Sequence, residues 1–136
     1  MERCVVKLNS QSDAAKKTKR YQSIAYAAAK QSQRGVVPVV GEPVSLAEAL
    51  AQMKGYDLSF VPYESEDGTT LKDVLTKADG VRTAAFLIGP EGGISGQELA
   101  AIKNAAFPTV TLGKRILRTE TAGEAVLSMM NYEFFL

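Results

Sequence analysis

Short apolar runs with strand character alternate with helix signals along most of the sequence. The runs occupy residues 2–8, 58–64, 84–89 and 109–113, and stretches with helical spacing or helix-capping residues separate them. Strands that alternate with helices are typical of α/β proteins, in which crossover helices join parallel strands. The sequence therefore predicts the α/β class with a mainly parallel sheet, built from a single domain of 136 residues.

Several helix boundaries can be predicted from local patterns. Residues 45–48, 95–98 and 121–124 each have the spacing of a capping box, in which a hydroxyl and a carboxylate satisfy free backbone N–H groups. Apolar residues at helical spacing predict a further helix over 21–34, and a short one is expected around 71–77. The last capping box predicts that the C-terminal helix begins at Thr121.

Composition excludes several classes of chemistry. The sequence has no histidine and one cysteine, Cys4. Zinc chemistry, Ser-His-Asp catalysis and an internal disulfide are therefore ruled out, and we expect no metal. No apolar run approaches the roughly 20 residues that cross a bilayer, and the first residues lack the pattern of a secretion signal. We expect no membrane span and a cytoplasmic location.

The net charge of +1 is small for a nucleic-acid-binding protein. It predicts weak binding of nucleic acid by this chain alone, because phosphate neutralisation dominates such affinity. The basic residues nevertheless cluster, at residues 16–20 and again at Lys114, Arg115 and Arg118. Solvated surface charge is an equally good interpretation of the first cluster.

Ligands of open parallel sheets bind beyond the carboxyl ends of the strands. Three strand exits are candidates here: residues 61–64, the glycine-rich segment IGPEGG at 88–93, and LGKRILRTETA at 112–122. The glycines allow a backbone to approach a ligand closely, although a tight turn would also use them. This segment matches neither the dinucleotide fingerprint nor a Walker phosphate loop.

The third exit places two arginines, a lysine and several hydroxyl groups between a strand and the last helix. Its charges and N–H groups could converge on one ligand. The alternative is structural: Ile116 and Leu117 would pack into the core, Thr121 would cap the helix, and the arginines would be solvated.

The segments LIGPEGG and LGKRILRTETA, in this order, closely resemble paired motifs of the RsmE family, the 16S rRNA uridine-N3 methyltransferases. ERCVVKL and KRYQSIAYAAAKQSQRGVVPVV upstream fit the same family, so the resemblance covers most of the chain. It implies a SPOUT fold, in which the C-terminal part of the chain forms a trefoil knot and its loops bind S-adenosylmethionine. General topology rules make a knot rare, so this expectation rests on the resemblance alone.

The matching motifs imply which residues contact the cofactor. Backbone groups would hold the adenine, and apolar side chains would wall the pocket. The expected binding residues are Leu87, Ile88, Gly89, Pro90, Gly92, Gly93, Leu112, Gly113, Ile116, Leu117, Arg118, Thr119 and Thr121.

The resemblance also implies the reaction and its partners. Arg118 is the first candidate to stabilise charge on the uracil ring, and the base would be Glu91, Glu120 or bulk water acting on the polarised imide. The expected partners are 16S rRNA of the small ribosomal subunit and a second copy in a homodimer. Family members usually begin with a PUA-like RNA-binding domain, and this chain is expected to lack it together with the first strand and helix of the methyltransferase domain.

Two rival interpretations remain at the level of the sequence. One is a SPOUT methyltransferase that acts on another RNA or on a ribose oxygen. The other is a non-catalytic RNA-binding or assembly module with the same fold. Binding of S-adenosylmethionine distinguishes the second rival from the enzymes.

Overall fold

The structure is a computed structural model that describes residues 1–4 and 10–135. The chain divides into two compact units. We call residues 1–4 with 45–135 the sheet unit and residues 10–44 the helical unit. Each is described by itself.

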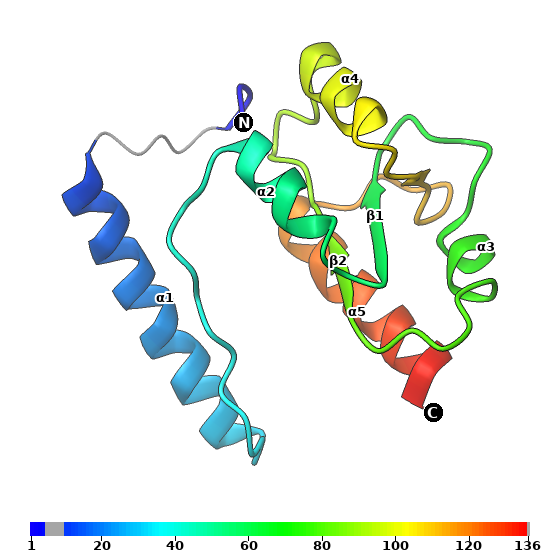
Figure 1. The fold of residues 1–136 in the computed structure, drawn as a ribbon. Coiled ribbons are helices and arrows are strands. Elements are labelled where there is room, and N and C mark those ends of the chain that lie inside the picture. The colour runs from blue at the N-terminus through cyan, green and yellow to red at the C-terminus, as the bar shows by residue number, and fades with distance from the viewer. Residues whose placement is uncertain (5–9, 136) are drawn as a thin grey trace. The chain divides into compact units, whose positions relative to one another are not determined.

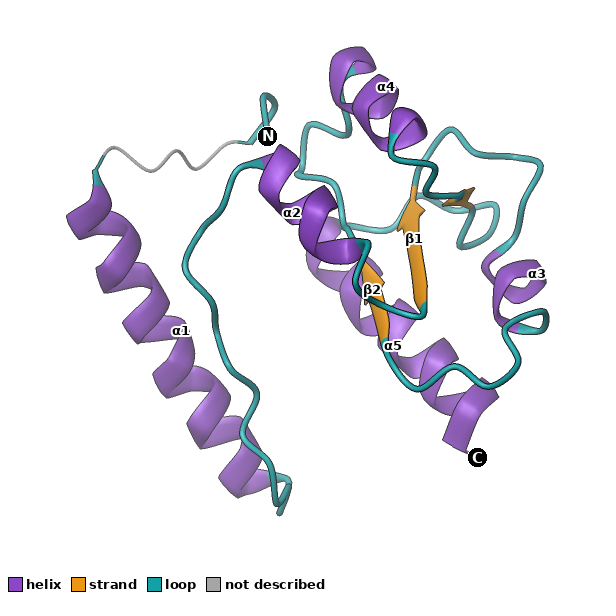
Figure 2. Ribbon diagram, viewed as in Figure 1, coloured by secondary structure: helices purple, strands orange, loops and turns teal. Residues whose placement is uncertain are grey.

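The sheet unit contains a parallel sheet of three short strands. They are β1 (Leu58–Pro62), β2 (Ala84–Phe86) and β3 (Thr109–Val110), in the spatial order β2-β1-β3. Leu58 pairs with Ala84 on one side of β1, and Val61 pairs with Thr109 on the other. The predicted α/β class with a parallel sheet is confirmed, and all three carboxyl ends lie at one edge (Figure 2).

Four helices complete the sheet unit: α2 (Leu46–Met53), α3 (Leu71–Leu75), α4 (Gly96–Asn104) and α5 (Thr119–Phe135). The capping boxes predicted at residues 45–48 and 95–98 are confirmed. A further box formed by Thr70 and Asp73 begins α3, and the sequence analysis missed it. Asp73 does the work of the usual glutamate, because its shorter side chain still reaches the Thr70 N–H at 2.9 Å.

The helices cover both faces of the sheet (Figure 1). On one face, Val61 packs against Leu50 and Met53 of α2 and Ile102 of α4. On the other face, Phe60 of the same strand packs with residues of α3, β3 and α5, namely Leu71, Leu75, Val110 and Val126. Successive side chains of a strand point to opposite faces, so β1 supplies one core residue to each layer.

The apolar run at 84–89 is shorter and less buried as a strand than its sequence indicates. Its continuous apolar residues are typical of a strand covered on both faces, yet only Ala84–Phe86 forms a strand and these residues are half-buried. Among the described residues, β2 lies at one side of the strand order and pairs with β1. The buried strand residues are Phe60, Val61 and Pro62 of β1 and Val110 of β3.

The predicted start of the last helix at Thr121 is wrong. The helix α5 begins at Thr119, and the N–H of Ala122 already donates to the carbonyl of Arg118 at 2.8 Å. A capping residue needs an extended backbone, whereas Thr121 is the third helical residue. The Thr119 hydroxyl, at the start of the helix, donates to the Gly89 carbonyl in the loop that follows β2.

The helical unit consists of α1 (Gln11–Gln31) and the segment that follows it. The helix begins ten residues before the predicted position, because Ser10 caps it by accepting a hydrogen bond from the Asp13 N–H at 3.1 Å. The side chain of Gln22 donates to the Pro38 carbonyl at 3.0 Å and accepts from the Val40 N–H at 2.8 Å. These two bonds hold the extended segment beside the helix.

The strand predicted at residues 2–8 lies mostly outside the described residues, and residues 2–3 form a turn. Among the described helices, none is long and apolar enough to cross a membrane.

Candidate functional site

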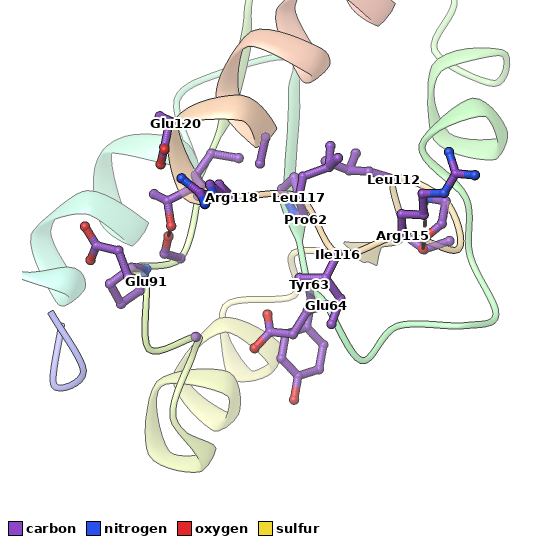
Figure 3. Close-up of a pocket in the computed structure, with 18 of the residues that line it drawn as sticks. Pro62, Tyr63, Glu64, Glu91, Leu112, Arg115, Ile116, Leu117, Arg118 and Glu120 are labelled. Carbon is purple, nitrogen blue, oxygen red and sulfur yellow. Dashed lines mark hydrogen bonds between the residues drawn. The ribbon is translucent and has the colours of Figure 1, made fainter. Parts of the chain in front are cut away.

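The three strand exits of the sheet unit line one cavity of about 680 Å³ (Figure 3). Pro62 ends β1 and is followed by Tyr63 and Glu64, residues 88–93 follow β2, and residues 111–120 follow β3. The consecutive strands β2 and β3 are separated in the sheet by β1, so the exit of β1 lies between the other two. This volume is within the usual range for small-molecule sites.

Most residues implied by the family motifs line this cavity. They are Ile88, Gly89, Pro90, Gly92, Gly93, Leu112, Gly113, Ile116, Leu117, Arg118 and Thr119, together with Glu91 and Glu120. Leu87 and Thr121 do not line it. Leu87 packs instead against the core beneath α2 and α4, and Thr121 is exposed on α5.

The glycine-rich segment forms a tight turn at the cavity wall. The Gly93 N–H donates to the Pro90 carbonyl at 2.8 Å, and Gly93 has a φ of 75°, which favours glycine. A Cβ at Gly93 would lie only 2.3 Å from Oε1 of Glu64. The turn therefore requires glycine here, and this glycine lets the carboxylate of the β1 exit lie directly against the backbone of the β2 exit.

Glycine is required at position 92 for a different reason, the close approach of Arg3. A Cβ at this position would lie 2.7 Å from Cβ and 2.8 Å from the carbonyl oxygen of Arg3, whose guanidinium donates to the Gly92 carbonyl at 3.4 Å. The substitution Gly92→Val, which the motif alone suggests as a test of ligand binding, would also displace residues 1–4. It is not a clean probe of the cavity.

The segment after β3 is held at both ends. The Thr111 hydroxyl bonds with both the N–H and the carbonyl of Gly113 at 3.2 Å, and Gly113 has a φ of 121°. At the other end, the Thr119 hydroxyl donates to the Gly89 carbonyl at 3.2 Å. This bond joins the glycine-rich segment at 88–93 to the segment at 112–122.

Between these ends lie Ile116 and Leu117, which the sequence predicts either to pack into the core or to form the wall of the cavity. Ile116 is 80% exposed, so it does not pack into the core. Leu117 is half-buried, and both residues line the cavity. The structure therefore favours the role of cavity wall over core packing for both residues.

Charged groups are distributed unevenly around the cavity. In Figure 3, Arg118 and Glu120 lie together at one end with Glu91 on the same side, and Arg115 lies at the opposite end. Arg118, Glu91 and Glu120 are exposed. Arg118 can stabilise developing negative charge, and a carboxylate on the same side of the cavity can accept a proton.

The exit of β1 was named as a place to search, but its residues were not among the expected binding residues. Pro62, Tyr63 and Glu64 line the cavity, as do Thr111, Lys114, Arg115 and Ala122. The parallel order of the sheet is the signal that could have included the first three, because the exit of a central strand lies between those of its neighbours.

Glu66 fixes the loop that follows β1. The Thr109 hydroxyl donates to its Oε2, and the N–H groups of Gly68 and Thr69 donate to its Oε1 at 3.0 and 3.3 Å. These bonds, the one from Thr109 first, hold the pKa of Glu66 below its usual value. The ionised carboxylate ties this loop to the start of β3. Among the described residues, no cluster of carboxylate or cysteine side chains could hold a metal ion.

The family model described as the RNA methyltransferase domain matches residues 1–131. The chain belongs to the RNA methyltransferase family. Its relatives include the ribosomal RNA small subunit methyltransferase E of Bacillus subtilis, with 36% identity over 96% of this chain and 52% of the relative. The enzyme of the same name from Mesomycoplasma hyopneumoniae is 33% identical over 85% of this chain and 49% of the relative. The resemblance stated from the motifs is confirmed, and the chain spans about half the length of these relatives.

Solved structures agree with this family. The ribosomal RNA small subunit methyltransferase E from Neisseria gonorrhoeae, bound to S-adenosylmethionine, matches with a TM-score of 0.83 and 37% identity over 97% of this chain and 52% of that chain. A Legionella pneumophila methyltransferase in complex with the same cofactor matches with a TM-score of 0.85 and 30% identity, again over 97% and 52%.

Proposed function

We propose that this chain binds S-adenosylmethionine in the cavity at the three strand exits and methylates N3 of a uridine in 16S ribosomal RNA. The observation that carries the proposal is the convergence of the segments 88–93 and 111–120 on one cavity, joined by the bond from Thr119 to Gly89. Two similar structures, at 30% and 37% identity, are bound to this cofactor.

The residues present fit the cofactor. The glycine turn at 89–93 exposes backbone near the cavity, where it could hold the adenine. Leu112, Ile116 and Leu117 offer apolar walls for the ring and the thioether chain. The cations of the 114–118 segment could bind a carboxylate, as a lysine or arginine does in other proteins.

When bound, the cofactor supplies an electrophilic methyl group on its sulfonium sulfur. The chain must orient uracil N3 and remove its proton, and correct positioning can contribute roughly 7–11 kcal/mol. We assign to Arg118 the stabilisation of negative charge on the uracil carbonyl oxygens, and to Glu91 or Glu120 the acceptance of the N3 proton. Both carboxylates lie on the Arg118 side of the cavity in Figure 3.

Further properties of the family belong to this proposal. We propose that residues 1–136 form a SPOUT domain whose C-terminal part is a trefoil knot. A homodimer through α5 is proposed because Leu127, Tyr132 and Phe135 are exposed apolar residues of that helix. The PUA-like domain ahead of this region and the cytoplasmic location stay predictions.

Ile116→Asp tests the cofactor site. Ile116 is exposed, so its replacement leaves the core intact, and a carboxylate in an apolar wall should weaken S-adenosylmethionine binding about tenfold or more. Calorimetric titration of the purified chain measures this. Tyr56→Asp is the matched control, because Tyr56 is an exposed apolar residue outside the cavity.

Equal cofactor affinities in Ile116→Asp and the wild type would contradict the assignment of this cavity. Absence of any cofactor binding by the wild type would contradict the proposed activity itself and favour a non-catalytic RNA-binding module.

A further inference from the structure

The small net charge of the chain hides a strong separation of charge between its two units. Residues 6–44 carry seven Lys or Arg and two Asp or Glu, a net charge of +5. The remainder carries nine Lys or Arg and thirteen Asp or Glu, a net charge of −4. The cavity lies in the acidic unit, so its own surroundings offer little attraction to a polyanion.

Four of the five cations of α1 lie on one side of the helix. Lys16 lies three residues before Lys19, four before Arg20 and fourteen before Lys30, which is close to one, one and four turns of helix. All four side chains are exposed. We call these four residues the basic stripe. At about 1.5 Å per residue, the stripe extends along about 21 Å of the helix axis.

The opposite side of α1 is occupied by contacts within the unit. Ala29 is buried, and Gln22 bonds to the segment of Pro38 and Val40. The acids of the unit are Asp13 in the first turn and Glu42, which lines a hollow beside Lys19. Among residues 1–4 and 10–135, no ion pair within 4.0 Å involves the stripe, so its charges are available to a partner.

Tyr26 adds an aromatic surface to the stripe. Its side chain is 56% exposed, and the ammonium of Lys30 lies 6.0 Å from the centre of its ring. Aromatic residues between cations are typical of surfaces that bind single-stranded nucleic acid, where bases stack on the ring and phosphates meet the cations.

We propose that the basic stripe of α1 is a second RNA-contacting surface, which binds phosphates of the rRNA strand while Tyr26 stacks on an unpaired base. The proposal rests on the proposed function, since it takes RNA as the substrate. A lipid surface is the less suitable partner, because an interfacial helix needs a broad face of large apolar side chains and most apolar residues of α1 are alanines.

The test compares two variants with the same change of charge. In one, Lys16, Lys19, Arg20 and Lys30 are replaced by Gln; in the other, the exposed cations Lys54, Lys72, Lys77 and Arg82 of the sheet unit are replaced by Gln. Glutamine keeps a helix propensity similar to lysine and arginine, so α1 should persist by circular dichroism. The probe is a fluorescent single-stranded oligouridine, titrated at several salt concentrations.

The stripe variant should lose affinity. The plot of log affinity against log salt should become shallower, its slope decreasing in magnitude by about 2.8, at about 0.7 for each lost phosphate contact. The control variant should keep most of the affinity and most of the salt dependence. Tyr26→Leu in the otherwise unchanged chain should weaken binding about fivefold or more, with the salt slope preserved.

Equal losses in the stripe variant and the control would overturn the proposal, and so would a wild type that binds oligouridine no better than the stripe variant. Tighter binding of the wild type to phosphatidylserine vesicles than to the RNA would overturn it in favour of a lipid partner. The calorimetric affinity for S-adenosylmethionine, measured on the same samples, reports on the proposed activity separately.

Discussion

Arg118 and Arg115 are two arginines of one segment that line the same cavity at opposite ends. Arg118 directly precedes α5 and has Glu120 and Glu91 on its side, whereas Arg115 lies near Leu112 (Figure 3). This placement makes the pair a natural comparison, because both changes remove one exposed guanidinium from one segment.

We expect Arg118→Ala to lower the rate of methyl transfer about a hundredfold. The reason is the loss of roughly 3 kcal/mol of transition-state stabilisation, by analogy with the removal of one oxyanion donor. Cofactor affinity should change much less. Single-turnover methylation at saturating cofactor, with small ribosomal subunits as substrate, measures the rate, and a parallel titration measures the dissociation constant.

Arg115→Ala serves as the control and should have a much smaller effect on the rate. A normal single-turnover rate in Arg118→Ala would remove this residue from the mechanism. A loss of cofactor affinity equal to the loss of rate would instead assign Arg118 to the cofactor carboxylate.

At the scale of the element, α4 depends on a buried carboxylate. Glu98 accepts hydrogen bonds from the N–H of Ser95 at 3.0 Å and from the N–H of Glu2 at 2.8 Å. Burial raises the pKa of Glu98, but these bonds and the nearby terminal ammonium outweigh burial and leave the pKa below its usual value. The side chain thus caps α4 and also attaches the first residues to it.

We expect Glu98→Gln to cost about 1 kcal/mol of unfolding free energy near pH 7. Because the pKa is lower in the folded chain than in the unfolded one, the stabilisation is fully present above the ordinary glutamate value of about 4.3. It is lost as the pH falls through the folded value. The difference between the two proteins, measured by urea unfolding, should therefore shrink as the pH falls below about 4.

Glu48 gives the matched control, since it occupies the same position in the capping box of α2 but is exposed. Glu48→Gln should be less destabilising than Glu98→Gln. Equal effects, or a difference for Glu98→Gln that grows towards acid, would contradict the role given to burial and to the contact with Glu2.

The elements could be predicted where local chemistry decides them. The capping boxes of α2 and α4 depend on residues three positions apart, and both predictions are confirmed. The start of α5 was wrong because Thr119 and Thr121 are both hydroxyl residues near the same strand exit. The choice of Thr119 involves the Gly89 carbonyl, thirty residues away, which no local pattern includes.

The order of the strands also lay beyond the local patterns. The continuous apolar run at 84–89 is typical of a strand covered on both faces, yet β2 lies at one side of the described strand order and is half-buried. The position of β1 between β2 and β3 therefore determined both the most buried strand and the contribution of residues 62–64 to the cavity. The paired motifs nevertheless predicted most of the lining residues.

At the scale of the whole molecule, the proposed homodimer leads to a prediction about α5. Leu127 and Phe135 are 54% and 80% exposed, so their replacement by Glu leaves the core formed by Val126 intact. We expect the wild type to sediment as a dimer and the double variant Leu127→Glu/Phe135→Glu to sediment as a monomer, because charge would be buried at the interface. Tyr56→Glu should remain dimeric.

A wild type that sediments as a monomer across the accessible concentrations would contradict the homodimer. Dimers that persist in the double variant would place the interface on another surface of the chain.

The strand order has a consequence for synthesis of the protein. The chain leaves the ribosome from its N-terminus, so β1 emerges before either strand that pairs with it. Its partners at Ala84 and Thr109 follow much later, and parallel pairing over such separations forms slowly. Until residue 110 is free, the apolar strand Leu58–Pro62 has an open edge that another nascent chain could pair with. The strand that organises the cavity is thus the segment most exposed to misassembly, and a holdase chaperone would have its greatest effect there.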